Sequence, residues 1–127
     1  MYIRQGRTEY FRENHSVNVG IGAVRTVIAA INVPAKAVAR IKSFGNYLGT
    51  VAAWGVAYWE VLVNGVPIEF YGGTPIIMDQ VGFAAQRQAS TEYEISGGSR
   101  ITVVGTNPTA AILAMGVSLE IEALYQE

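Results

Sequence analysis

Apolar and polar residues alternate with a period of two over most of the chain, most clearly near its C-terminal end. One face of this stretch carries Val117, Leu119, Ile121, Ala123 and Tyr125, and the other carries Ser118, Glu120 and Glu122. Because successive side chains of a strand point to opposite faces, the pattern predicts a half-buried strand. We expect one bent strand over residues 110–125, with a bend or bulge at Gly116.

Shorter stretches of the same kind predict further strands. Residues 25–33 and 37–44 are joined by a short connection that begins with Pro34, and residues 100–107 end before Pro108. The pair Asn64-Gly65 fits the positive φ angles of a tight type I′ turn, so we expect a hairpin of residues 58–63 and 66–71. Residues 74–81 are apolar and of strand length, whereas the middle of 82–96 also tolerates a short turn of helix.

These stretches predict about eight strands separated by Gly, Pro and Asn turns, and no sustained helical period occurs. An antiparallel sandwich of two sheets is the simplest all-β architecture for such a chain. We favour a jelly roll over an immunoglobulin fold, because the strands are numerous and the chain has no cysteine pair. With 127 residues, one domain is expected.

The first fifteen residues differ from the rest, because they follow neither period. Arginines at positions 4, 7 and 12 are interleaved there with aromatic and acidic residues. We therefore expect an N-terminal arm over residues 1–15 and a sandwich domain over 16–127. The arm would be an extended tether on a neighbouring subunit, since arginine and aromatic residues dominate interface hot spots. The alternative is a frayed terminus or an ordinary first strand.

Composition narrows the classes of partner. Half of the residues are apolar, 15% are charged, and the mean hydropathy is +0.26. That is high for a protein whose whole surface faces water, so we expect a partner to cover part of it. A net charge of -1 offers no basic field for nucleic acid. The chain shows neither a signal peptide nor the roughly 20 apolar residues of a membrane span, which favours synthesis in the cytoplasm.

Candidate chemistry is sparse, since the chain has one His, one Asp and no Cys. His15 and Asp79 could join a serine in a catalytic triad, but no serine of the chain stands in a G-x-S-x-G nucleophile elbow. A lone His gives no metal-ligand spacing. The pairs Glu92/Glu94 and Glu120/Glu122 each share a strand face, which we interpret as a solvent-facing one. No nucleotide-binding glycine motif is present. We expect a protein that is not an enzyme and that needs neither cofactor nor metal.

Residues 43–59 carry no charge but hold five aromatic rings and three glycines. Trp59 is in phase with Val61 and Val63, so that face should point into the core. Between Gly45 and Gly55 no strand pattern persists, and we expect a loop with Tyr47, Leu48 and Trp54 at or near the surface. Such a loop suits a protein interface or a sugar-binding platform. The simpler alternative is that the rings only cap the open end of the sandwich.

The phrases "NVPAKAVARIKSFGN", "WEVLVNGVPI" and "EISGGSRITVVGTNPT" resemble small all-β virion proteins of tailed and other icosahedral bacteriophages. The resemblance spans roughly residues 30–110. It implies a jelly roll that decorates or cements a capsid by clamping major capsid subunits, often as an oligomer, and it brings no catalytic residues.

The expected role is thus a structural virion protein, assembled in the host cytoplasm, that contacts major capsid protein and forms a homo-oligomer. Its candidate interface comprises Arg4, Arg7, Tyr10, Phe11, Arg12, Tyr47, Leu48, Trp54 and Tyr58. The alternative is a carbohydrate-binding module for host recognition, in which Trp54, Tyr47 and Tyr58 would stack on sugar rings.

Overall fold

The computed structural model of the protein describes residues 8–53, 55–68, 76–77, 86–88 and 94–125. Apart from one 3₁₀ turn, η1 (Val51–Ala53), all regular structure in these ranges is β. The strands are β1 (Thr8–Val19), β2 (Thr26–Asn32), β3 (Ala37–Leu48), β4 (Tyr58–Val63), β5 (Val66–Pro67), β6 (Ile76–Ile77), β7 (Gln86–Gln88), β8 (Glu94–Ile95), β9 (Arg100–Thr106) and β10 (Leu113–Tyr125). The expected all-β class is confirmed.

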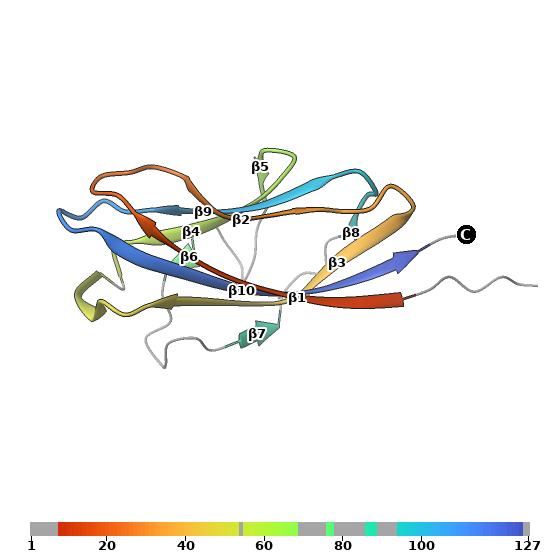
Figure 1. Ribbon diagram of the computed structural model, residues 1–127, viewed down its shortest axis with the longest axis horizontal. Helices are drawn as coiled ribbons and strands as arrows, with labels where there is room; N and C mark the ends of the chain where they lie inside the picture. Colours follow the sequence, from red (N-terminus) through yellow and green to blue (C-terminus); the bar gives the residue numbers. More distant parts are fainter. Residues whose placement is uncertain (1–7, 54, 69–75, 78–85, 89–93, 126–127) are drawn as a thin grey trace, which may run out of the picture.

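The strands form two antiparallel sheets that pack face to face (Figure 1). The β1 sheet has the order β1-β10-β3-β7, with β8 also paired to β3, and the β2 sheet has the order β2-β9-β4-β5, with β6 also paired to β4. Because β5 and β6 share one position, as do β7 and β8, the described strands occupy eight positions. The first strand lies beside the last, and β1 to β4 alternate between the sheets, which is the arrangement of a jelly roll.

The core lies between the sheets, where the inward rows meet. The row of β10 comprises Leu113, Met115, Val117, Leu119, Ile121 and Ala123, all buried. From the other sheet, Trp59 and Val61 of β4 face it with no exposed surface, as the sequence predicted for Trp59.

The hairpin between β4 and β5 confirms the predicted turn. Asn64 and Gly65 have φ angles of 51° and 82°, which is the type I′ combination. The Asn64 side-chain oxygen also accepts a hydrogen bond from the backbone N–H of Arg100 over 2.9 Å, so the turn is fastened to the start of β9. Of residues 82–96, where a helical turn was tolerated, β7 and β8 are strands, and residues 82–85 and 89–93 lie outside the described residues.

A bulge in β3 changes which of its residues face the core. Glu120 pairs with Ser43 and Ile121 with Ile41, so Lys42 is an extra residue on the β3 side. Before the bulge the odd positions point inward, and after it the even positions do. Leu48 is therefore fully buried, whereas Tyr47 is 41% exposed.

Three expectations about this region are wrong. Residues 45–48 continue the strand rather than begin a loop, and Leu48 belongs to the core instead of the surface. Gly116, the expected bend, pairs regularly with Ser16 and Tyr47, because the irregularity is in the neighbouring strand at Lys42.

The structure also revises the expected N-terminal arm. From Thr8 onward the chain is β1, paired residue by residue with β10, so residues 8–15 are an edge strand of the sandwich. The inward row of β1 mixes Phe11 and Val17 with Glu13 and His15, and this mixture hid the period of two. Residues 1–7, which include Arg4 and Arg7, lie outside the described residues.

Candidate interaction surface

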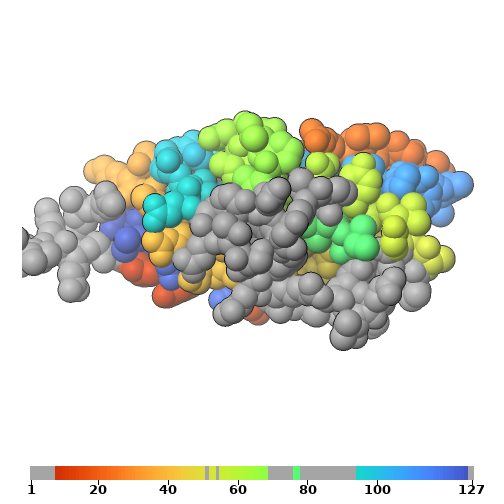
Figure 2. Space-filling view, turned by 180° about the vertical axis from the view of Figure 1, so that it is seen from behind, coloured from red at the N-terminus to blue at the C-terminus, as the bar shows by residue number. Residues whose placement is uncertain are grey.

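Three loops from distant parts of the sequence meet at one end of the sandwich. They are the β1–β2 loop (20–25), the β3–β4 loop (49–57) and the β9–β10 loop (107–112). The strand register brings them together, because Val19 pairs with Leu113, Leu48 with Met115, and Tyr58 with Thr106. Figures 1 and 2 show this group of loops, here named the loop end, from opposite sides.

The loop end is almost free of charge. Residues 16–24, 43–59 and 101–119 contain no Asp, Glu, Lys or Arg. In the β1 sheet the boundary runs straight across the strands, where Arg12 pairs with Glu120 and Glu120 with Ser43. Among the described charged residues of β1, β3 and β10, Glu13 lies one position beyond this line toward the loops, and the others lie on the line or toward the opposite end of the molecule.

Arg25 is the exception within these loops, and its charge is compensated. Its guanidinium donates two hydrogen bonds to the Glu60 carboxylate, at 3.1 and 3.0 Å. The Glu60 side chain is only 11% exposed, whereas that of Arg25 is 48% exposed. The backbone N–H of Arg25 also donates to the hydroxyl of Thr106 over 3.1 Å, which holds the end of the loop against β9.

Aliphatic side chains protrude from all three loops. The exposed fractions are 63% for Ile21, 71% for Val24, 48% for Val56 and 64% for Ile112. Single exposed aliphatic residues are common on protein surfaces, but a group on adjoining uncharged loops is typical of an interaction site.

Asn107 holds two of these loops in place. It is fully buried, and its side-chain amide donates hydrogen bonds to the carbonyl oxygens of Val19, Gly20 and Ala111. Its backbone N–H donates a hydrogen bond to the carbonyl oxygen of Ala23 over 2.9 Å. Because one buried residue bonds backbone groups of both loops, the loops that carry Val24 and Ile112 are held in a defined conformation.

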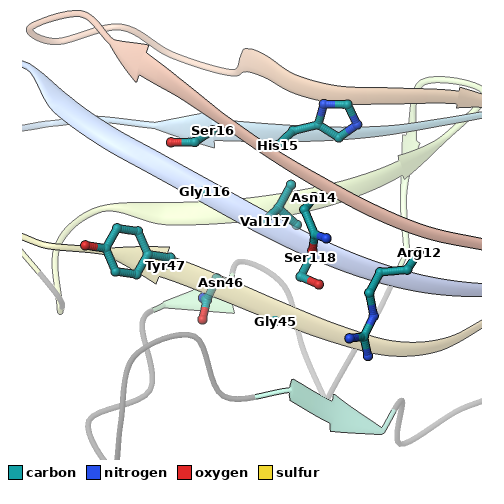
Figure 3. Close-up of a pocket in the computed structure, with 10 residues that line it drawn as sticks. All are labelled: Arg12, Asn14, His15, Ser16, Gly45, Asn46, Tyr47, Gly116, Val117 and Ser118. Carbon is teal, nitrogen blue, oxygen red and sulfur yellow. The ribbon is translucent and has the colours of Figure 1, made fainter.

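A shallow depression of about 450 Å³ lies beside the loop end, on the outer face of the β1 sheet (Figure 3). Its floor is low because Gly45 and Gly116 have no side chain and Ser118 has a short one. Asn14 and Ser16 of β1 line one side, and Tyr47 of β3 stands at the end near the loops. The depression has both polar and apolar lining and lies mostly on the uncharged side of the boundary.

The candidate interface residues do not form one surface. Tyr10 and Arg12 are exposed on the outer face of β1, where Arg12 binds Glu120 over 3.1 Å, and Phe11 packs against the core. Tyr47 lies next to the loop end, and the half-buried Tyr58 lies on β4 opposite Ile77. Leu48 is in the core. Arg4, Arg7 and Trp54 lie outside the described residues.

Sequence reasoning missed the aliphatic residues of the loop end. Ile21, Val24 and Ile112 stand in two stretches that are as free of charge as residues 43–59. The shared lack of charge in three separate stretches was the available signal. That the three meet in space required the strand register.

The residues considered for catalysis or metal binding are not gathered at one place in the described part of the chain. His15 is exposed on β1, and its Nε2 lies 3.0 Å from the Glu13 carboxylate. Asp79, its candidate partner in a triad, and Glu92 lie outside the described residues. Glu94 and Glu120 are solvent-facing as expected, paired with Arg40 and Arg12. Within the described ranges, no group of three His, Asp or Glu residues is arranged to hold a metal ion.

In comparisons with known proteins, no family model matches the chain, and no curated protein matches it in sequence. In the part of the chain that the structure describes, no helix is long and apolar enough to cross a membrane.

Proposed function

We propose that this protein is a non-enzymatic structural component of a bacteriophage particle, which decorates or cements the capsid through contacts with major capsid protein. The observation that carries the proposal is the loop end, where exposed aliphatic side chains from three loops stand on a nearly uncharged surface. The resemblance of residues 30–110 to small phage virion proteins supports the choice of a capsid as partner.

Burial of the loop end against another protein carries little desolvation cost. The centre of a protein interface is depleted of charged residues, because an ion that is buried without a partner costs several kcal/mol. The loop end can be buried without this cost, since Arg25 already has Glu60 as its partner. Asn107 keeps two of the loops in place before binding, so less conformational entropy is lost on association.

Repetition over a shell would add to the strength of such contacts. A specific interface buries at least about 1,000 Å², and a symmetric particle offers many copies of the same site. We therefore place the protein in the virion, assembled in the host cytoplasm and working as a homo-oligomer. The first test is co-sedimentation, in which the chain should travel with particles purified from the infected host and should be absent from gradient fractions without particles.

A second candidate function is carbohydrate binding, which the depression on the β1 sheet favours. Hydroxyl and amide groups of Asn14, Ser16 and Ser118 line it, and the partly exposed ring of Tyr47 lies at its end. Polar groups beside an aromatic ring are the usual equipment of a sugar site. On a glycan array, binding that disappears in Tyr47→Ala would support this function. No binding by the wild-type protein would exclude it for the sugars present.

A further inference from the structure

Strand β1 is an unusually complete sheet edge. It runs for twelve residues, pairs with β10 without a register shift, and contains no proline. Among the described residues, no strand pairs with its other side. Long regular edges offer a row of backbone donors and acceptors to another chain, so proteins usually shorten, bulge or cover them. The edge strand of the opposite sheet is short and bulged, since β2 has seven residues and a bulge at Ile28.

The side chains of β1 that face the second sheet have a self-complementary order. Along the strand they read Phe11, Glu13, His15 and Val17, which is apolar, acidic, basic, apolar. Phe11 and Val17 pack against the core, whereas Glu13 and His15 remain about two-fifths exposed. When such a row is reversed and placed beside itself, acid meets base and apolar meets apolar.

We propose that β1 pairs antiparallel with β1 of a second copy of this chain, about a twofold axis at Asn14. In this register Glu13 lies opposite His15 of the second copy, and Phe11 lies opposite Val17 of the second copy. Each contact occurs twice because the axis repeats it. The two β1 sheets then form one continuous sheet, and the apolar row extends from one molecule into the next.

The outer row of β1 is compatible with the same register. Tyr10 comes opposite Asn18, Arg12 opposite Ser16, and Asn14 opposite its own copy. No two like charges face each other on this side. Arg12 keeps its existing partner Glu120, which lies on β10 within the same molecule.

The neighbouring registers of the β1 pair are less stable. A shift by two pairing positions in one direction centres the axis on Glu13 and brings two carboxylates together. The opposite shift centres it on His15, which then faces its own copy. Like groups directly opposite each other destabilise a strand pair, so the charge order selects the register at Asn14.

The pairing deepens the proposed function and rests on it only for its role. An antiparallel pair directs the two loop ends away from each other, because each lies beyond Val19 of its own β1. A dimer of this form has two docking surfaces at its far ends and would bridge two capsid subunits. The pairing itself is measured on the purified chain alone, so failure of capsid binding and failure of dimerisation are separate results.

Disulfide trapping tests the register, because the natural chain has no cysteine. In Asn14→Cys the two thiols lie directly across the axis, within the roughly 7 Å between Cα atoms that a disulfide permits. Oxidation should give a cross-linked dimer on a non-reducing gel. In the control Asn18→Cys the two thiols are eight residues apart along the strands, about 27 Å, and should not cross-link.

Charge exchange tests the same contact without cross-linking. By sedimentation velocity, His15→Glu should weaken the dimer roughly tenfold relative to wild type, because the new carboxylate then faces Glu13 of the other copy in both symmetry-related contacts. Glu13→Lys should weaken it similarly, and Glu13→Lys with His15→Glu should restore it. Glu94→Lys, a charge reversal on the far side of the sheet, should change nothing. A wild-type monomer, or a dimer indifferent to His15→Glu and without cross-linking at position 14, would overturn the proposal.

Discussion

The side-chain amide of Asn107 donates a hydrogen bond to the carbonyl oxygen of Val19 over 3.1 Å, and this contact joins the β9–β10 loop to the end of β1. The same amide reaches Ala111 over 2.7 Å, while its oxygen accepts hydrogen bonds from the backbone N–H and the hydroxyl of Thr109. One buried side chain thus serves backbone groups on both loops. The position of the exposed aliphatic residues depends on it.

Replacement of this residue should be costly. We expect Asn107→Ala to lower the free energy of unfolding by about 2–3 kcal/mol, because several buried carbonyl groups lose their donor at once. Urea denaturation measures the change. The control is Asn18→Ala, at an exposed position of β1, which should stay within about 0.5 kcal/mol of wild type. Equal costs for the two variants would show that Asn107 does not hold the loops.

Two neighbouring residues test the bulge in β3. Leu48 is fully buried and Tyr47 is 41% exposed, because Lys42 shifts the alternation of the strand. Leu48→Ala should therefore lower the free energy of unfolding by about 2–5 kcal/mol. Tyr47→Ala should cost much less, about 1 kcal/mol or below. The reverse order would mean that the alternation continues unshifted past Ile41.

The pair Arg25 and Glu60 should respond unequally to loss of either partner. If Glu60 is replaced by Gln, Arg25 keeps its contact with water, since about half of its side chain is exposed. If Arg25 is replaced by Ala, a mostly buried carboxylate is left without its cation. We expect Arg25→Ala to cost about 1–3 kcal/mol and Glu60→Gln to cost less, measured by thermal and urea unfolding at neutral pH. A larger loss in Glu60→Gln would contradict this assignment of the buried partner.

Gly97 marks the tightest backbone approach at the opposite end. A Cβ at this position would overlap the carbonyl oxygen of Ala35, and backbone atoms cannot move aside as a flexible side chain can. Gly97→Ala should lower the free energy of unfolding by about 1–3 kcal/mol in a denaturation experiment. The matched variant is Gly20→Ala, whose new methyl group would meet only Ala23 at 4.0 Å, and it should be nearly neutral. If Gly97→Ala is equally neutral, the turn has room that the structure does not show.

Much of the sandwich could be predicted from local pattern. The alternation from Val117 to Ala123 gave the inward row of β10, and Asn64-Gly65 gave the hairpin turn, because a period of two and positive φ angles are properties of short segments. The burial of Trp59 followed from its phase with Val61.

The predictions that failed concern features that are set by contacts between distant segments of the chain. The bulge at Lys42 is a mismatch between β3 and β10, and neither strand shows it alone. The strand at residues 8–15 was obscured because an edge strand can leave Glu13 and His15 in water on its inward side. The loop end was missed for the same reason, since Val24 and Ile112 become neighbours only through the pairing of β1 with β10.

Rebinding of purified variants to phage particles produced without this chain tests most directly whether the loop end contacts major capsid protein. Val24→Asp and Ile112→Asp each place a carboxylate in the loop end at a position more than 60% exposed, so folding should be unaffected. If the loop end is the contact with major capsid protein, each should reduce the affinity at least about tenfold, because the carboxylate is desolvated without a partner. Val66→Asp, the same change at the exposed hairpin of the opposite end, should bind as wild type does. Equal binding by all three variants and the wild type, or a loss confined to Val66→Asp, would contradict the account.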